Sequence, residues 1–445
     1  MGEDSAKTTV PVDLLRWGLY VSELDRPWIE TPFLFQGFRI VSDEELRTLR
    51  EYCRVVVIEA ERSDAAAMES LRADLAQRGD DLPEPVSAPN AATEAAVEGP
   101  GERERRKSAG VLSEDRLYPD RKRFGTLVRA AFVRRRQMRR AVEDALEQVR
   151  MGRLVDLPKT RAAVESVMDV VVEDASAALW LTNLRNRHEY TAIHSVNVCV
   201  LTLALGVHLG LERKLLERLG LGALLHDVGK VRTPPDLLDK PGPLTAAEFE
   251  IVKRHAQDGH DIVARSGTVP TEALEIIRLH HERLSGQGYP SGLAGDDIPR
   301  HVRIAGLADT YDAMTSDRAY RDARAPDKAL HDLYRDAPNA FGVDLVQEFI
   351  RCLGIFPVGS AVELDNDAVG VVVGARPGGG LWPVVLMVRA PDGEPFRKRI
   401  LLNLAAAAQQ HGEISRRRIR RAVNPASVAI DVASIVAAEF GLGAA

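Results

Sequence analysis

The segment Leu224-Leu-His-Asp-Val-Gly-Lys230 places a histidine and a carboxylate at the end of an apolar helical run. Apolar residues recur at i, i+3 and i+4 through residues 215–226, which predicts a helix, and Gly229 then breaks the pattern. His226 and Asp227 are therefore expected to face inward. Because a buried, unpaired carboxylate costs several kcal/mol, this pair requires a partner, and a divalent metal ion would supply one.

Side chains with the same chemistry recur on the neighbouring predicted helices. Imidazoles and carboxylates without a thiolate suit Fe, Mn, Co, Ni or catalytic Zn, and they argue against a closed structural zinc site. With His226 and Asp227 the candidate ligands number seven, too many for one ion and right for two with Asp227 as the bridge. A pair of such ions is the common active-site arrangement in enzymes that hydrolyse phosphate esters. The other five candidates are His194, His255, His280, His281 and Asp309.

Residues 156–355, which contain these candidates, are predicted to form a helical domain. The segments whose apolar residues follow helical spacing are 164–184, 195–209, 215–226, 246–265, 272–280 and 303–314. Residues 1–61 are predicted to form a small α+β domain. There Ser42–Glu45 opens a helix with an N-cap and first-turn acids, and Arg54–Ile58 is a β-branched strand.

Residues 62–155 are predicted to connect these two domains. Residues 62–115 are poor in large apolar side chains, so we expect a flexible linker with a transient helix over 63–78. Residues 116–155 form a connecting helix, in which Arg121–Arg140 carries nine basic residues and no acidic one. Such a helix can bind nucleic acid or a calmodulin-like partner, or it can be a connector with a solvated basic face. We favour the connector.

Residues 356–445 are predicted to form a small β-rich appendage, barrel-like, with a last helix rich in alanine. Short β-branched runs at 361–364, 370–373 and 383–388 are separated by Asn-Asp and Gly-rich turns.

Composition narrows the class of protein. The 445 residues carry a net charge of −6, which gives no indication of a nucleic-acid polymer or an anionic membrane as partner. The three cysteines form no CxxC pair, which excludes a disulfide-dense scaffold and a cysteine-based zinc finger. The acidic N-terminus and the lack of a run of 18 apolar residues favour a cytoplasmic protein without a signal peptide or membrane span.

The sequence HDVGK at 226–230, followed by HHERLSGQGYP at 280–290, resembles the HD-GYP family, a branch of the HD superfamily of metal-dependent phosphohydrolases. The resemblance covers residues 190–349, including YTAIHS at 190–195, KPGPLTAAEFEIVKRH at 240–255 and ADTYDAMTSDRAYR at 308–321. It implies a mainly α fold with an HD-superfamily helical bundle. The segment PVDLLRWGLYVSELDRPW at 11–28 is similar to the small domain of unknown function that often precedes HD-GYP in bacterial proteins.

The resemblance also implies roles for individual residues. Tyr190 stands where some members carry a Glu that binds a third metal, so two ions per chain are expected, Fe or Mn first and Zn, Co or Ni as alternatives. Lys230 matches a lysine that reaches a substrate phosphate, and Arg318 and Arg321 match a basic pair suited to the other phosphate. Independently of the resemblance, Asp312 in the segment ADTYDA is expected to be a helix-surface carboxylate. The implied ligand sets are His194, His226, Asp227 and Asp309 for one ion, and Asp227, His255, His280 and His281 for the other.

The implied activity is hydrolysis of cyclic di-GMP, since family members convert it to pGpG and on to GMP. A water that bridges two cations loses a proton near neutral pH, and the bridging hydroxide would attack phosphorus while Lys230 stabilises charge on the non-bridging oxygens. Asp227 and Lys230 are therefore the predicted catalytic residues. Family precedent further implies a homodimer and diguanylate cyclase domains as partners of the Gly286–Pro290 loop.

Three positions depart from the family pattern without replacing a ligand. Ser285 stands where Asp is usual, Leu284 where an aromatic residue is usual, and Gly342 where Asp is common. These departures leave open a catalytically weak or inactive module that acts as a cyclic di-GMP receptor or a protein-interaction domain. A third interpretation keeps the enzyme and changes the substrate to another cyclic dinucleotide, such as cyclic GMP-AMP.

Overall fold

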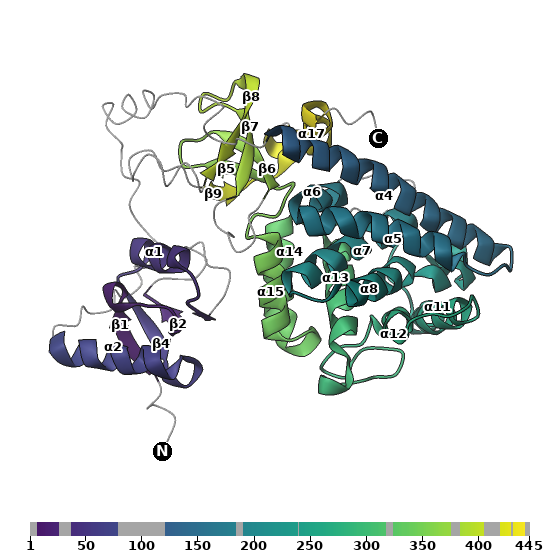
Figure 1. The fold of residues 1–445 in the computed structure, drawn as a ribbon, viewed down its shortest axis with the longest axis horizontal. Coiled ribbons are helices and arrows are strands. Elements are labelled where there is room, and N and C mark those ends of the chain that lie inside the picture. Colours follow the sequence, from purple (N-terminus) through teal and green to yellow (C-terminus); the bar gives the residue numbers. More distant parts are fainter. Residues whose placement is uncertain are drawn as a thin grey trace. The chain divides into compact units, whose positions relative to one another are not determined.

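The protein, seen in a computed structural model, folds as two compact units, residues 1–108 and 109–445 (Figure 1). The first unit is a small sheet with two helices, and the second is a helical bundle followed by another sheet. The mainly α fold class, with sheets near both ends of the chain, is confirmed. The residues that the structure describes are 7–25, 37–78, 121–183, 190–238, 240–316, 324–374, 383–404, 419–428 and 430–440.

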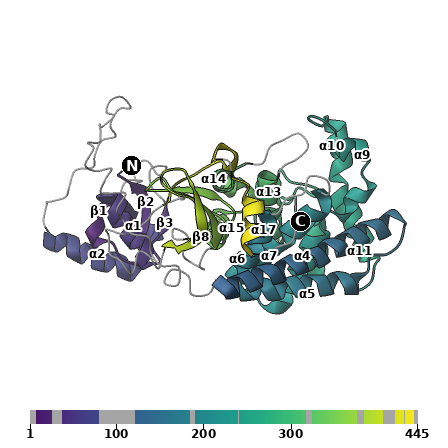
Figure 2. The same cartoon turned by 90° about the horizontal axis from the view of Figure 1, so that it is seen from above.

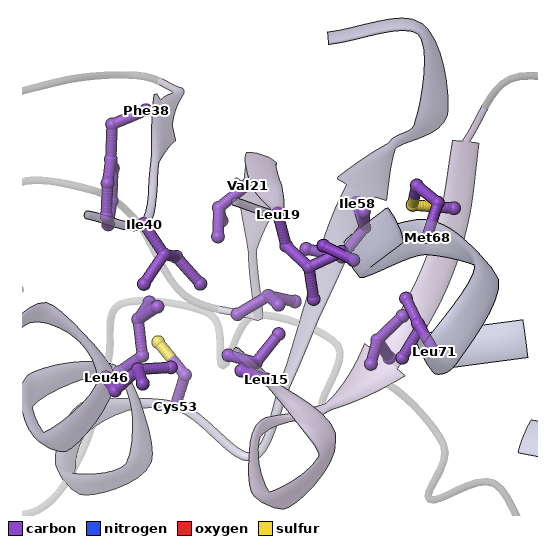
Figure 3. Close-up of a cluster of buried hydrophobic side chains, with 14 residues drawn as sticks. Leu15, Leu19, Val21, Phe38, Ile40, Leu46, Cys53, Ile58, Met68 and Leu71 are labelled. Atoms are coloured by element: carbon purple, nitrogen blue, oxygen red, sulfur yellow. The ribbon is translucent and has the colours of Figure 1, made fainter. Parts of the chain in front are cut away.

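The first unit is built on a four-stranded antiparallel sheet with the strand order β1-β4-β2-β3. Helix α1 begins after Ser42, whose hydroxyl accepts a hydrogen bond from the backbone N–H of Glu45 at 3.2 Å, as the N-cap pattern predicts. Apolar side chains from the sheet and both helices form one cluster, shown in Figure 3. The elements are β1 Lys7–Pro11, β2 Tyr20–Leu24, β3 Phe38–Arg39, α1 Asp43–Tyr52, β4 Val55–Glu59 and α2 Ala65–Arg78.

Helix α2 shows that the predicted domain boundary at residue 61 is too early. Met68 and Leu71 of α2 are buried in the same cluster as Leu19 and Ile58 of the sheet (Figure 3). Residues 62–78 are therefore part of the domain and not linker. A few apolar side chains on one helix face suffice for this packing, although the average composition of the segment is polar. The rest of the predicted linker, residues 79–115, lies outside the described residues.

The second unit contains the predicted helical domain together with the predicted connecting helix. The single helix expected over 246–265 is two helices that meet at Arg254, and the helix expected over 164–184 starts earlier and is interrupted at Asp174. The helices are α4 Arg121–Arg150, α5 Leu157–Glu173, α6 Ala175–Leu179, α7 Tyr190–His208, α8 Arg213–Leu225, α9 Pro235–Leu238, α10 Ala246–Lys253, α11 His255–Ala264, α12 Thr271–Leu279, α13 Arg300–Thr315, α14 Pro326–Ala340 and α15 Val343–Leu353.

Helix α4 packs lengthwise on the bundle and contacts α5 and α7 (Figures 1 and 2). Its inner face buries Val128, Met138 and Val142. Arg136 and Arg140 are exposed on its outer face, so the solvated basic face expected of a connector is present. The inner face makes α4 an integral layer of the second unit as well as a connection.

Helix α7 forms the centre of the bundle, in contact with α4, α5, α8, α13 and α15. Among the described residues it is the one helix that could span a membrane by length and composition, over Thr191–His208. However, 78% of that stretch is buried in the protein, which is the condition of a core helix.

The C-terminal appendage is a five-stranded antiparallel sheet with the strand order β8-β7-β6-β5-β9. The three predicted strands are present, but β8 and β9 stand at opposite edges, so the described strands form an open sheet and the barrel-like prediction is wrong. The indole N–H of Trp180 donates to the carbonyl of Val373 at 2.9 Å and links the sheet to the bundle. The strands are β5 Ala361–Leu364, β6 Val369–Gly374, β7 Val384–Arg389, β8 Pro395–Asn403 and β9 Ile419–Ala422, and the last helix is α17 Val432–Phe440.

Candidate metal centre

The segment that ends helix α8 forms the floor of the candidate site. After Leu225 the chain enters a short 3-10 helix, Val228–Arg232 (η6). Gly229 is required there because a Cβ at this position would lie 2.0 Å from the carbonyl oxygen of His255 on α11. This close approach turns His226 and Asp227 into the bundle, where each side chain is at most 2% exposed.

All seven predicted ligands lie close together around this segment. His194 comes from α7, His255 from the start of α11, His280 and His281 from the end of α12, and Asp309 from α13. Three overlapping groups each bring their ligand atoms within 4.8 Å of one another. These groups are His194, His226 and Asp227; His226, His280 and Asp309; and His255, His280 and His281.

Asp227 lies between two halves of the cluster. Its Oδ2 is 3.7 Å from Nε2 of His194 and 3.4 Å from Nε2 of His226, whereas its Oδ1 is 3.5 Å from Nε2 of His255. His194 Nε2 also lies 3.0 Å from Oδ1 of Asp309. One carboxylate therefore faces imidazoles on both sides, which is the placement expected of a bridging ligand.

Backbone carbonyls fix the orientation of three imidazoles. Nδ1 of His226 donates to Ala223 at 2.8 Å, Nδ1 of His255 donates to Val252 at 2.7 Å, and Nδ1 of His280 lies 3.1 Å from the carbonyl of Ile276. Because a carbonyl oxygen only accepts, Nδ1 carries the proton and the Nε2 lone pair is directed at the cluster. These rings are thus arranged to coordinate a cation.

The charge on three of the histidines is consistent with metal ligation. Burial lowers the pKa of His280 to about 3, and burial likewise lowers the pKa of His255 and holds the pKa of His281 well below its usual value. Neutral imidazole is the form that binds metals. Burial opposes ionisation of Asp227, but the charge of Lys230 at 2.5 Å and the nearby histidines outweigh it and keep the pKa of Asp227 well below its usual value.

Two buried atoms of the cluster fit a metal in particular. Within the described part of the chain, Nε2 of His226 and Oδ1 of Asp227 have no hydrogen-bond partner. A buried polar atom without a partner is costly, and an imidazole nitrogen and a carboxylate oxygen are both typical donors to a divalent cation. The residues present therefore fit a metal ion.

Asp312 is a buried side chain beside the cluster, and the prediction that it lies on the helix surface is wrong. It is 2% exposed, and its carboxylate accepts from Nδ1 of His194 at 2.7 Å and from the amide of Asn197 at 2.9 Å. Burial opposes protonation of His194, but the hydrogen bonds to Asp309 and Asp312 outweigh it and raise its pKa to about 9. Asp312 thus orients His194 from behind. Its i+3 spacing from Asp309, on the same helix face, is the signal that could have located it.

Glu282 is a buried side chain beside the cluster that the sequence analysis did not single out. It is 2% exposed and accepts hydrogen bonds from the backbone N–H groups of Ser291, Gly292 and Leu293 at 2.7, 3.1 and 2.9 Å. Gly288 completes this fold, since a Cβ there would lie 2.5 Å from the Cα of Glu282. The loop is consequently held against the end of α12, beside the cluster.

The departures from the family pattern lie in backbone positions around this loop. Ser285 pairs with Ala294 in a β-bridge and donates its N–H to the carbonyl of Asn339 at 2.9 Å. Gly342 precedes α15 with φ at 94°, a region that glycine adopts far more readily than other residues. Neither residue is a member of the cluster.

Of the three predicted phosphate-binding residues, the structure describes only Lys230. It lies at the cluster, where its ammonium forms an ion pair with the carboxylate of Asp227. Arg318 and Arg321 lie outside the described residues. Tyr190 is the first residue of α7, one turn before His194.

Two family models match the chain. A domain of unknown function, DUF3391, matches residues 7–160, and an HD domain matches residues 177–345. The first match extends through α4, which the structure places in the second unit.

Several curated proteins are similar to this chain. A cyclic di-GMP phosphodiesterase of Pseudomonas aeruginosa is 33% identical over 365 residues, covering 82% of this chain and 81% of the relative. A cyclic di-GMP phosphodiesterase response regulator of Xanthomonas campestris is 39% identical, covering 32% of this chain and 38% of its own. A 3'3'-cGAMP-specific phosphodiesterase of Vibrio cholerae is 36% identical, covering 38% of this chain and 36% of its own.

Proposed function

The chain belongs to the HD-GYP family, with a DUF3391 domain before its HD domain, and from that premise we propose that it is a metal-dependent phosphodiesterase acting on cyclic di-GMP. The observation that carries the proposal is the convergence of all seven candidate ligands in one buried cluster. The similarity to a cyclic di-GMP phosphodiesterase along most of both chains supports the choice of substrate.

We assign two divalent ions to the cluster, Fe or Mn first. One ion would be held by His194, His226, Asp227 and Asp309, and the other by Asp227, His255, His280 and His281. The position of Asp227 between imidazoles on both sides supports this division. When bound, such ions supply Lewis acidity toward phosphate oxygens and lower the pKa of the water between them.

The chain's own cations would bind the phosphates. Lys230 is 26% exposed at its side chain and stands at the cluster, so its ammonium can move from Asp227 to a phosphate oxygen of the substrate. We assign the second phosphate to Arg318 and Arg321, because a guanidinium binds phosphate oxygens in pairs. Hydrolysis would release pGpG, GMP or both.

Metal content and product analysis test this function together. Protein purified without added metal would be analysed for ions per chain, reloaded anaerobically with Mn or Fe, and incubated with cyclic di-GMP before chromatography. We expect about two ions per chain and linear dinucleotide or GMP. Bound metal without any product would refute the phosphodiesterase, and tight binding of intact nucleotide in that case would identify a receptor.

One observation makes 3'3'-cGAMP the second candidate substrate. The chain is 36% identical to a 3'3'-cGAMP-specific phosphodiesterase over 171 residues. Competing cyclic di-GMP with 3'3'-cGAMP in one reaction measures the preference directly. We expect cyclic di-GMP to be consumed first, and preferential loss of 3'3'-cGAMP would reassign the substrate.

We further propose a cytoplasmic homodimer whose Gly286–Pro290 loop contacts diguanylate cyclase domains. Within this loop Gln287 and Pro290 are exposed, which supports a surface role. Sedimentation of the purified protein, alone and with a diguanylate cyclase domain, tests both parts. A monomer that does not co-sediment would contradict them.

A further inference from the structure

The cluster of candidate ligands is most exposed to solvent at His281 and Lys230. The side chains of His194, His226 and Asp227 are at most 3% exposed, whereas 21% of the His281 side chain and 26% of that of Lys230 are exposed. A dinucleotide too large for a buried cavity would therefore present its phosphate from this side.

Aromatic rings form a row that leads outward from this opening. Tyr289 stacks on His281, with ring centroids 4.5 Å apart and planes at 29°. Phe249 then meets Tyr289 edge to face, with centroids 5.9 Å apart and planes at 83°. The ammonium of Lys253 lies 4.8 Å from the Phe249 centroid and 5.6 Å from that of Tyr289. We name this row the ring platform.

The outer end of the ring platform is exposed but firmly held. Phe249 is 42% exposed, on a helix at the edge of the second unit (Figure 2). Its helix α10 starts with a capping box, in which Thr245 and Glu248 bond each other's backbone N–H groups at 3.3 and 2.7 Å. Lys240 adds an ion pair to Glu248 at 2.6 Å. An exposed aromatic side chain on a helix with a capped N-terminus, beside the opening of the cluster, suits a planar ligand.

We propose that Phe249, supported by Tyr289, is the surface on which one base of the cyclic dinucleotide stacks. The proposal rests on the proposed function, because the cluster would hold the phosphodiester to which that base is attached. Stacking on an aromatic ring accepts any purine, so the ring platform orients the nucleotide without selecting guanine over adenine. Phe249 thus contributes to binding of both cyclic di-GMP and 3'3'-cGAMP.

The kinetic test replaces Phe249 by leucine, which keeps an apolar side chain but removes the aromatic face. In the metal-loaded full chain we expect F249L to raise KM for cyclic di-GMP about tenfold, since loss of one stacking contact is worth a factor of this order. The effect on kcat should stay within about twofold, because the residue lies outside the metal ligands. F249W should restore the low KM. The control V172A removes an exposed apolar side chain on α5.

A fluorescence measurement tests the ring platform without turnover. A cyclic dinucleotide with 2-aminopurine in place of one guanine loses fluorescence when the base stacks. With metal-loaded protein and a phosphorothioate form of this dinucleotide that resists hydrolysis, we expect quenching by the wild-type chain and by V172A, and little quenching by F249L at a protein concentration that saturates binding. An unchanged KM and equal quenching for F249L would overturn the proposal. If the metal-loaded wild type fails to hydrolyse cyclic di-GMP, the proposed function falls, while the quenching still decides on stacking.

Discussion

The buried interior of the first unit and the buried centre of the second are built from different chemistry. The cluster in the first unit is formed by apolar side chains such as Leu19, Ile58 and Leu71. The centre of the second unit buries histidines and aspartates within hydrogen-bond or ion-pair distance of one another. Burying charge is costly, so the second arrangement indicates function, whereas the first is explained by stability alone.

The largest effect is expected at Asp227, the carboxylate that we propose to bridge the two ions. Asp227→Asn keeps the shape of the side chain and removes the charge that both halves of the cluster share. We expect loss of bound metal, measured by elemental analysis, and a loss of phosphodiesterase activity of at least about 10²–10³-fold. Asp258→Asn, in a solvent-accessible ion pair with Arg232, is the matched control. Normal metal content in the Asp227 variant would contradict the bridging role.

Leu71→Ala examines the apolar cluster of the first unit. Truncating a fully buried leucine is expected to lower the free energy of unfolding of this unit by about 2–5 kcal/mol. Denaturant unfolding measures the change, and metal content should remain that of the wild type. Arg72→Ala, exposed on the same helix, should change stability by about 0.5 kcal/mol or less. If Leu71→Ala were equally neutral, residues 62–78 would be linker after all.

Asp312→Asn is expected to have an intermediate effect, because Asp312 acts through His194. The amide oxygen can still accept from Nδ1, but without the charge the ring is a weaker ligand. Loss of such a partner typically lowers metal affinity by about 10–100-fold. Competition with a chelator measures this affinity, and Asp312→Ala should lose more than Asp312→Asn. Affinities equal to that of the wild type for both variants would assign Asp312 to stability alone.

The smallest effect is expected from a substitution at Gly342, a position where the chain departs from the family pattern. Gly342→Asp restores the common family residue at a position with φ of 94°. The side chain has room, because a Cβ at this position would lie 3.6 Å from Leu284, so the cost is backbone strain of about 1–2 kcal/mol. Thermal unfolding should show this loss while metal content stays unchanged. A gain of activity instead would mean that Gly342 limits catalysis.

The sequence was sufficient to predict which seven residues lie together in the cluster, because each belongs to a motif whose residue types have few other uses together. Asp312 and Glu282 could not be assigned in the same way. Their roles depend on which neighbour each carboxylate meets, namely His194 across the bundle for Asp312 and three loop amides for Glu282. Apart from the i+3 spacing of Asp312 from Asp309, the local sequence does not identify these neighbours.

The fold was predictable where apolar residues recur with a regular spacing. It was less predictable where a segment was judged by its average composition. The β-branched runs of the C-terminal sheet and the apolar spacing of α8 and α12 predicted the correct elements. Helix α2 was missed as a domain element because its few buried side chains stand among many polar ones. Closure of a sheet depends on pairing between distant strands, which local alternation does not determine.

The inner face of helix α4 determines where this protein can be cut. Val128, Met138 and Val142 are covered by the bundle, and Asp312 partly offsets the effect of burial on the Arg135 guanidinium, whose pKa is lowered to about 10. Starting the chain at residue 156, the predicted beginning of the catalytic domain, would uncover that apolar strip and leave Asp312 without the nearby cation. A fragment meant to retain its metal should therefore begin ahead of Arg121, and its solubility would fall with each turn of α4 removed.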